Sequence, residues 1–494
     1  MTTVRITRAP LAVQDLIAIV DGGRVELDAA VLADIAAARA VVDQALRSGA
    51  AVYGLTTQVG HAKDTRLDAG QIRGEQQFLI TSHFGGMGGP LPAELVRAAL
   101  AVRLNGIARG GSGASIACAE TLAAMLNAGV HPLVPEIASI GAADVGQMAG
   151  IAQVAVGMGR AEYRGDVLDG GEALRRAGIT PLVLSGKDGL AMMSANGVSV
   201  GQGALVAARA ARAAEAADIA AALSMEAIGA NVSVLHPAVA RAKGVPGQVA
   251  AADHLRSLLE GSPLEEPEGA RSVQDALSFR VVPQVHGALR EYVAAAASAV
   301  STELNAAADN PLAAVVEGRL ISNGNFHPMV MAIAFDALRI ALAHVGQLSD
   351  RRMAHLWDVF FRQLTPGPPP GPAYGLQVRY PAAARYAELR QLAGPATLDT
   401  PALDIGVEDH GTSAPLSVRL ADRALDVLED ILASELLLAH DVLATAPTRA
   451  RLGAGTAAAL RMVEEAIAAA EPRADAVHDA LRDRFPGPRR PAGG

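Results

Sequence analysis

Alanine-rich segments with helical periodicity are the feature that most limits how this chain can fold. From Ala204 to Ile228 alanine is the commonest residue, and neither glycine nor proline interrupts the run. Leu425, Leu428, Leu432 and Leu436 recur at spacings of three and four residues, which places them on one face of a helix. Hydrophobic residues make up 51% of the 494 residues but aromatic residues only 3%, a composition that favours closely packed helices. The sequence therefore predicts an all-α fold, mainly a bundle of long helices.

The rest of the chain predicts a small β-containing N-terminal region and further helices. Val4 and Ile6 indicate a short strand at the start, and 365–372, TPGPPPGP, is a loop because proline breaks helices. Helices are expected over residues 29–46, much of 73–130, 204–228, 289–308 and 328–352. We expect three parts: 1–200 as an N-terminal domain with the loops discussed below, 201–480 as a helical bundle, and 481–494 as a disordered tail.

Charge and cysteine content exclude several classes of protein. The net charge is -9, from 42 basic and 51 acidic residues, and no dense basic run occurs, so we expect no nucleic-acid partner and no anionic membrane surface. The single cysteine, Cys118, cannot form an intrachain disulfide and fits a reducing cytoplasm. We expect neither a signal peptide nor a membrane-spanning helix. The histidines have no metal-ligand spacing, so we expect no metal site.

Two loops stand out from the helical pattern. The stretch Val134–Gly150, VPEIASIGAADVGQMAG, contains three glycines and no aromatic residue, so its backbone can turn tightly. The stretch from Tyr53, YGLTTQVGHAKDTRL, lacks apolar periodicity and also reads as a loop.

These loops and four other segments resemble, in the same order, motifs of the histidine and aromatic amino acid ammonia-lyase family. The other segments are SHFGG with VRLNGIARGGSG, the segment ending at Asn196-Gly197, VQDALSFRVVPQVHGA, and NGNFHP with VEDHGTSAP. The resemblance runs from about Val25 to Leu443. It implies an ammonia-lyase/fumarase-like helical architecture, a small amino acid or betaine substrate, and a homotetramer in which three subunits build each active site.

The resemblance also assigns roles to residues of this chain. It makes Tyr53 the catalytic base and Arg280 the group that binds the substrate carboxylate, for which a guanidinium is suited because it offers a two-pronged donor. It places further substrate-binding residues at His83, Asn196, Gln274, Asn325, Phe326 and Glu408. Other roles stay open: Arg280 as a structural helix cap, Asn325 as an N-cap, and Glu408 as the buried partner of a structural arginine.

The chain departs from the family pattern at several positions. The family forms an electrophile, 4-methylideneimidazole-5-one, from Ala-Ser-Gly, but here Ala142, Ala143 and Asp144 follow one another. Ala143 has no hydroxyl to eliminate, and the glycine whose amide would close the ring is missing, so we expect no such cofactor. Leu277 replaces a tyrosine of the family pattern. Lys63, Arg379 and Tyr380 stand at positions where the family has uncharged or small residues. We assign Lys63 and Arg379 to catalysis, because a nearby cation would favour the Tyr53 phenolate, and Tyr380 to substrate binding; a solvated face or an ion pair is the alternative for Arg379.

Without an electrophile, elimination requires a substrate whose amine leaves by itself. A quaternary ammonium carries no proton to lose and departs as a neutral amine, as in the ergothionases, the branch of the family that this chain resembles in its missing triad. The leading hypothesis is therefore a carbon–nitrogen lyase that releases trimethylamine from a betaine such as ergothioneine, without a cofactor. The alternatives are an ammonia-lyase or aminomutase of histidine or an aromatic amino acid, and a non-catalytic member of the family.

Overall fold

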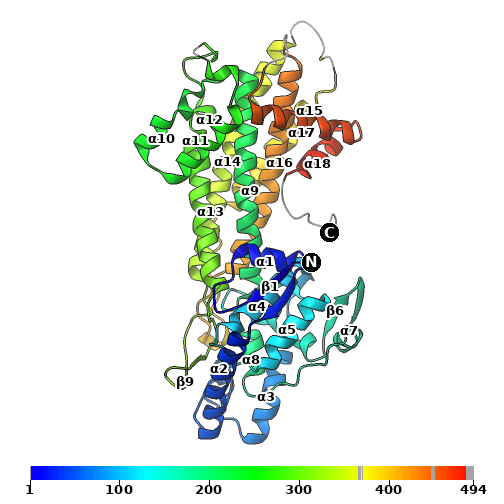
Figure 1. Ribbon diagram of the computed structural model, residues 1–494, viewed down its shortest axis with the longest axis vertical. Coiled ribbons are helices and arrows are strands. Elements are labelled where there is room, and N and C mark those ends of the chain that lie inside the picture. The colour runs from blue at the N-terminus through cyan, green and yellow to red at the C-terminus, as the bar shows by residue number, and fades with distance from the viewer. Residues whose placement is uncertain (1, 267, 365–368, 370, 447–450, 486–494) are drawn as a thin grey trace. The chain divides into compact units, whose positions relative to one another are not determined.

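The computed structural model describes residues 2–266, 268–364, 369, 371–446 and 451–485, and their contacts divide the chain into two compact units (Figure 1). Unit 1 consists of Met1–Leu205, Ala297–Ala334 and Ala396–Arg419. Unit 2 consists of Val206–Ala296, Phe335–Pro395 and Leu420–Gly494. Each unit therefore combines segments that are far apart in the sequence.

Unit 1 contains all of the short strands in the described residues. Strands β1 (Thr3–Ile6) and β2 (Arg24–Leu27) pair in parallel, while β3 (Met87–Pro90) and β5 (Pro135–Ile137) pair antiparallel. An antiparallel sheet has the order β4 (Val130–Pro132), β6 (Arg160–Tyr163), β7 (Asp166–Asp169), and β8 (Leu312–Ala314) pairs with β9 (Arg319–Ile321). The predicted N-terminal strand is confirmed, and the expected strands occur beside helices rather than as a separate sheet domain.

The helices that lie wholly in unit 1 surround these strands. They are α1 (Val13–Val20), α2 (Ala29–Ser48), α3 (Ala69–Ser82), α4 (Ala93–Ala108), α5 (Ile116–Ala128), α6 (Val145–Ala155), α7 (Gly170–Arg176) and α8 (Asp188–Met193). Short 3-10 turns are η1 (Gly60–Ala62) and η4 (Asp404–Gly406). Helix α4 is the buried centre of the unit, because every residue from Val96 to Ala108 is buried.

Unit 2 is built on the unit-2 parts of four long helices. These are α9 (Gly197–Ile228), α13 (Val282–Leu304), α14 (Met329–Gln363) and α16 (Ala414–Ala444). Shorter elements pack around them: α10 (Pro237–Lys243), α11 (Pro246–Leu259), α12 (Leu277–Arg280), α15 (Tyr374–Leu392), α17 (Ala454–Ala469), α18 (Ala474–Arg482), η2 (Val232–Leu235) and η3 (Pro263–Glu265). The predicted helical architecture is confirmed.

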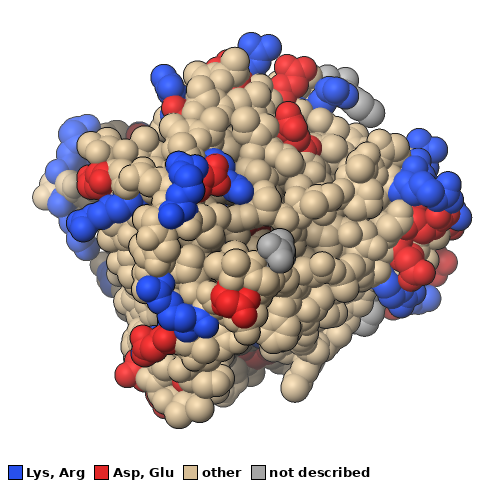
Figure 2. Space-filling view, turned by 90° about the horizontal axis from the view of Figure 1, so that it is seen from below, with Lys and Arg blue, Asp and Glu red and all other residues tan. Residues whose placement is uncertain are grey.

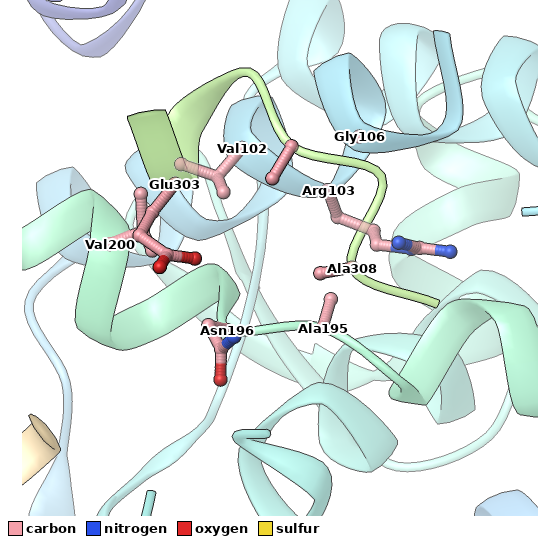
Figure 3. Close-up of a pocket in the computed structure, with 9 residues that line it drawn as sticks. Val102, Arg103, Gly106, Ala195, Asn196, Val200, Glu303 and Ala308 are labelled. Carbon is pink, nitrogen blue, oxygen red and sulfur yellow. The ribbon is translucent and has the colours of Figure 1, made fainter. Parts of the chain in front are cut away.

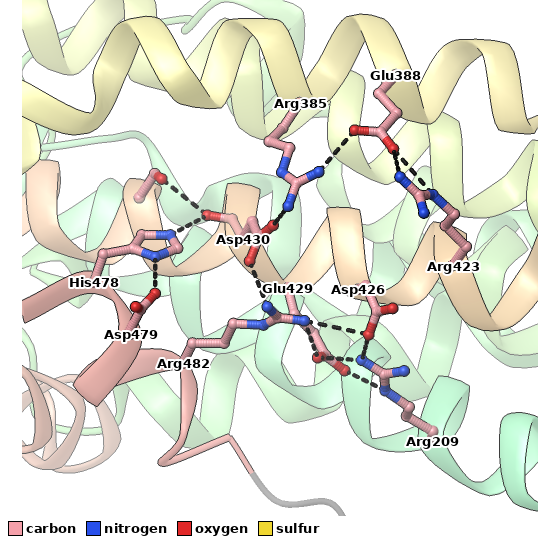
Figure 4. A network of polar contacts seen from close by, with 11 residues as sticks. Arg209, Arg385, Glu388, Arg423, Asp426, Glu429, Asp430, His478, Asp479 and Arg482 are labelled. Atoms are coloured by element: carbon pink, nitrogen blue, oxygen red, sulfur yellow. Dashed lines mark hydrogen bonds and ion pairs between the residues drawn. The ribbon is translucent and has the colours of Figure 1, made fainter. Parts of the chain in front are cut away.

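Ion pairs as well as apolar contacts hold unit 2 together (Figure 4). The leucines of the predicted stripe, Leu425, Leu428, Leu432 and Leu436, are all fully buried. On another face of α16, Arg209 of α9 pairs with Asp422, Asp426 and Glu429 at 2.6–2.8 Å. Arg482 of α18 reaches Asp430 at 3.0 Å, so these contacts tie the last described helix to α16.

Several predicted boundaries need correction. Helix α13 ends at Leu304 rather than at 308. The next residue, Asn305, uses its side-chain amide to bond the backbone N–H and carbonyl of Leu11 at 2.7 and 3.0 Å. Helix α18 runs through Arg482 with Leu481 buried, so the expected disordered tail cannot begin at 481. Residues 486–494 of that tail lie outside the described residues, as do 365–368 and 370 of the expected proline loop.

Helix α14 is the one described helix that is long and apolar enough to cross a membrane, although we expected no membrane-spanning helix. More than half of its most apolar window, 56%, is buried within the protein, as in a core helix. On the face seen in Figure 2, basic and acidic side chains occur in small groups, and the described part of that face carries no extended basic patch.

Shortening one leucine of the α16 stripe should destabilise the protein strongly. Leu432→Ala leaves a cavity in a fully buried position, which costs about 2–5 kcal/mol. Leu416→Ala, at a position of the same helix that is 37% exposed, should cost less than about 1 kcal/mol. Urea and thermal denaturation of both variants would check this, and equal losses would contradict the assignment of the stripe to the core.

Candidate active site

Tyr53 lies in a tight turn after α2 that hydroxyl groups hold in shape. The Thr56 hydroxyl donates to the Ala50 carbonyl at 2.5 Å and accepts from the Val52 N–H at 2.9 Å. Gly54 has φ 63°, and a Cβ there would lie 2.6 Å from a Leu190 methyl group, so this position requires glycine. Tyr53 is half-buried, and its phenolic oxygen accepts a hydrogen bond from the Gly60 N–H at 3.1 Å.

The charges around Tyr53 are negative. Burial raises the pKa of Tyr53, and the carboxylates of Glu408 and Asp404 raise it further, while the Gly60 N–H opposes them. Lys63 instead pairs with Asp64 at 2.5 Å and is exposed. Within unit 1, the charged groups that shift the pKa of Tyr53 are the carboxylates of Glu408 and Asp404. The expectation that Lys63 or Arg379 lowers this pKa stays a prediction.

A loop over residues 403–413 brings Glu408 to this turn. Asp404 and Ile405 adopt left-handed φ values of 48° and 55°, and Leu403 pairs with Glu408 through the backbone. Asp404 also contacts His61 at 2.8 Å, which joins the loop to the Tyr53 turn. Partial burial raises the pKa of the Glu408 carboxyl, and the charge of Asp404 raises it further, whereas His83 lowers it. Tyr53, His83 and Glu408 therefore belong to one electrostatic cluster.

The turn at residues 139–144 is bound by its backbone to three remote segments. Gly141 and Ala143 have φ values of 86° and 58°. The Ala143 N–H donates to the Phe326 carbonyl at 3.1 Å, and the Asp144 N–H donates to the Ala195 carbonyl at 2.9 Å. The Thr412 hydroxyl donates to the Gly141 carbonyl at 2.7 Å. The turn thus connects the segments before α9, before α14 and before α16.

Asp144 is the completely buried residue that precedes α6. One carboxylate oxygen accepts from the N–H and the hydroxyl of Ser199 at 2.8 and 2.9 Å, and the other has no partner among the described residues. Burial raises the pKa of Asp144 to about 6, although the bonds from Ser199 oppose this shift.

Asn196 lines a small pocket in unit 1 (Figure 3). Its side chain is 4% exposed, and neither its amide oxygen nor its amide nitrogen has a partner in the described part of the chain. The pocket holds about 20 Å³, which is room for a water molecule. Figure 3 shows Glu303 of α13 directing its carboxylate into this space, and burial raises the pKa of Glu303 to about 7. The sequence analysis missed Glu303, because nothing in its helical segment distinguishes it.

A pair of histidines that the sequence analysis did not single out joins the segments before α14 and α16. His327 Nε2 lies 2.8 Å from His410 Nδ1, and Phe326 packs its ring edge-on against His327. Asn325 is exposed and lies four residues before the start of α14, and its N–H donates to the Asn323 side chain at 2.8 Å. The alternative role of Asn325 as an N-cap is wrong, because α14 begins only at Met329.

The other predicted site residues lie in unit 2. Gln274 is exposed, and Arg280 ends the four-residue helix α12 and is half-buried, with no side-chain partner within the described residues. A hollow of about 440 Å³ lies against this helix, lined by Ala276, Leu277, Ser278, Val281, Val285, His344, Gln347, Leu348, Arg351 and His355. Arg379 forms an ion pair with Asp350 at 2.9 Å, and Tyr380 is 77% exposed beside Trp357.

The structure thus divides the predicted residues into two groups. Unit 1 carries Tyr53, Lys63, His83, Asn196, Asn325, Phe326 and Glu408, whereas unit 2 carries Gln274, Arg280, Arg379 and Tyr380. The first group includes a phenol, a carboxylate and an imidazole, which suit proton transfer and the binding of a cation. The second supplies an unpaired guanidinium, which suits a carboxylate.

Comparison with known proteins agrees with this chemistry. The family profile described as aromatic amino acid lyase matches residues 11–465. The chain belongs to the aromatic amino acid lyase family. It is 34% identical over 462 residues to histidine ammonia-lyase from Caldanaerobacter subterraneus subsp. tengcongensis, an alignment that covers 92% of this chain and 91% of that protein. Carbon–nitrogen lyase is therefore its class of enzyme.

Solved structures of this family have the same fold. The ergothioneine-degrading enzyme ergothionase from Treponema denticola, solved with desmethyl-ergothioneine sulfonic acid, superposes with a TM-score of 0.91 at 27% identity, covering 97% of this chain and 99% of that chain. Histidine ammonia-lyase from Trypanosoma cruzi superposes with a TM-score of 0.86 at 29% identity, covering 98% and 93%.

Asp144→Asn should change how stability depends on pH. The native carboxyl of Asp144 binds its proton more tightly than the unfolded one, so its contribution to stability is present below pH 3.8 and is lost as the pH rises through about 6. Asparagine cannot titrate, and its stability advantage over the wild type should grow by about 1–2 kcal/mol between pH 5 and pH 8. Urea denaturation at both pH values would measure it; an advantage that shrinks over this range would contradict the burial argument.

Proposed function

We propose that this protein eliminates a tertiary amine from the betaine of an imidazole or aromatic amino acid, giving the conjugated acrylate, and does so without a protein-derived electrophile. Trimethylamine release from a betaine such as ergothioneine is the favoured reaction. The observation that carries the proposal is Ala143, a buried alanine in the turn where the family's Ala-Ser-Gly would be.

The residues of this turn do not fit the family's prosthetic group. Ala143 has no hydroxyl whose loss could create a methylene group, and Asp144 follows directly where a glycine is needed. The nearby hydroxyl of Ser139 is already engaged, because it donates to the Ala143 carbonyl at 2.6 Å and accepts from the Gly141 N–H at 2.9 Å. The proposed elimination therefore proceeds without this group.

The electrostatics of unit 1 favour a cationic substrate. In the free chain, burial and, after it, the carboxylates of Glu408 and Asp404 hold the pKa of Tyr53 high, which disfavours the phenolate needed for proton abstraction. A trimethylammonium placed among these groups would be attracted by the carboxylates and would offset their effect on Tyr53. Tyr53 would then take the proton from Cβ, and the amine would leave from Cα with the bonding electrons.

Other residues would hold the substrate. Arg280 would bind the carboxylate, and Phe326 and Tyr380 offer aromatic faces for the ring or the ammonium group. His83, Asn196, Gln274 and Asn325 stay proposed contact residues. The catalytic roles of Lys63 and Arg379 stay a proposal; in this structure Lys63 pairs with Asp64 and Arg379 with Asp350.

A homotetramer in the cytoplasm completes the proposal. The proposed base and the proposed carboxylate-binding arginine belong to different units, as suits a site assembled from several subunits. Cys118 is buried, and burial raises its pKa, so it is a packed thiol suited to a reducing compartment. A fully active enzyme with the solution mass of one chain would contradict the tetramer.

The second candidate is a histidine ammonia-lyase, which the curated relatives favour: that of Gloeobacter violaceus is 37% identical over 466 residues, covering 92% of this chain and 90% of the relative. The intact mass of the purified protein separates the candidates. We expect the mass of the unmodified chain and no effect of borohydride on activity. A mass lower by two water molecules, or loss of activity after borohydride, would show that the electrophile forms.

Tyr53→Phe should reduce kcat at least about a hundredfold, because general-base catalysis contributes about that much or more. Substrate binding should change little, since only the phenolic oxygen is lost. Wild-type rates in this variant would refute the assignment of the base.

Glu408→Gln serves as the companion variant. It removes a negative charge that raises the pKa of Tyr53, so the increase of kcat/KM with pH should occur at lower pH than in the wild type. An unchanged pH profile would show that the charge of Glu408 does not influence the catalytic base.

A further inference from the structure

We infer that Arg352 is a positioning residue that holds α12, and through it Arg280, in place for the substrate carboxylate. The inference deepens the proposed function and rests on the role of Arg280 in it. All of the residues concerned belong to unit 2.

Helix α12 is too short to be stable without external support. It has only four residues, Leu277–Arg280, and Ala276 at its N-cap provides no side-chain bond. A single turn fixes several backbone angles for very few hydrogen bonds, and isolated short helices are unstable in water. The position of Arg280 therefore depends on what anchors this turn from outside.

Arg352 of α14 provides such an anchor from the protein interior. Its side chain is completely buried, and Nη1 donates to the Ser278 carbonyl oxygen at 3.2 Å, two residues before Arg280. The adjacent Phe279 is 2% exposed, and its ring lies 5.8 Å from the ring of His355, which is on α14 like Arg352. Arg352 thus makes the polar contact with the turn, and the Phe279 ring adds an apolar one.

Arg352 is itself fixed by two more helices. Its Nε and Nη2 donate to the two oxygens of Glu435 on α16 at 2.6 and 2.9 Å, a two-pronged ion pair in which both side chains are fully buried. Glu435 also accepts from the Ser224 hydroxyl of α9 at 2.7 Å. The chain of contacts from α9 through α16 and α14 ends at the Ser278 carbonyl.

Stability alone does not account for this arrangement. A buried ion pair can often be replaced by apolar residues without loss of stability, so its value lies in fixing a geometry. Arg352 is also not needed as a partner for the buried carboxylate of Asp218. That carboxylate already pairs with His254, His286 and Arg290 at 2.6–2.9 Å. The remaining contact of the Arg352 guanidinium is the one with α12.

Arg352→Lys is the main test, because lysine keeps the charge but cannot bond Glu435 through a fork and reach Ser278 as well. The double variant Arg352→Met/Glu435→Leu, which leaves no unpaired charge, covers the case that the lysine variant does not fold. Arg339→Lys is the matched control: Arg339 is equally buried on α14, but it bonds the Leu392 and Gly394 carbonyls and Asp336 instead.

The readout is binding of 3-(imidazol-4-yl)propanoate and of its amide to the intact enzyme, by calorimetry. Wild type should prefer the acid. In Arg352→Lys and in the double variant the Kd of the acid should rise about tenfold, equivalent to about 1.4 kcal/mol, with the Kd of the amide unchanged. KM should rise while kcat stays within about twofold. Arg339→Lys should keep the wild-type preference for the acid.

Distinct results would overturn the inference and the proposed function. An unchanged preference for the acid in the folded Arg352 variants, or equal weakening of acid and amide, would show that Arg352 has no positioning role. A preference for the acid that survives Arg280→Met, or is missing in the wild type, would instead refute Arg280 as the carboxylate-binding residue, and the inference with it.

Discussion

The backbone hydrogen bonds of the turn from Gly141 to Asp144 are the interaction on which the proposed site depends. Ala143 binds the Phe326 carbonyl, Asp144 binds the Ala195 carbonyl, and Thr412 binds the Gly141 carbonyl. Because the partners come from the segments that precede three long helices, the turn fixes where Asn196, Phe326 and the loop of Glu408 lie. Ala143, which adopts a left-handed conformation in this turn, therefore has a structural role that does not depend on any catalytic one.

The charges around Tyr53 determine which substrates the proposed site favours. Burial and the nearby carboxylates raise the pKa of the phenol, so the free chain holds a poor base next to a good binding place for a cation. A substrate with a permanent positive charge would correct this imbalance when it binds. The same substrate carries a leaving group that needs no electrophile, so both arguments lead to the same class of compound.

The fold was predictable from the sequence to a greater extent than the site. Alanine-rich periodicity and the leucine stripe of α16 predicted the helical bundle because those patterns directly determine packing. The end of α13 was not predictable, because the residue that follows it, Asn305, contacts Leu11, which lies 294 residues away in the sequence. Motifs identified Tyr53 and Glu408, but Glu303, His61 and the pair of His327 and His410 have polar partners or surroundings that only the fold reveals.

The leaving amine distinguishes the proposed reaction from that of an ammonia-lyase, and two substrates that differ only in this amine reveal which one the enzyme releases. The trimethylammonium betaine of histidine and histidine itself share one skeleton and differ in the amine that must depart. We expect the purified enzyme to convert the betaine at least about a thousandfold faster than histidine, a difference of roughly 4 kcal/mol in the barrier. Rapid release of ammonia from histidine, phenylalanine or tyrosine would contradict it.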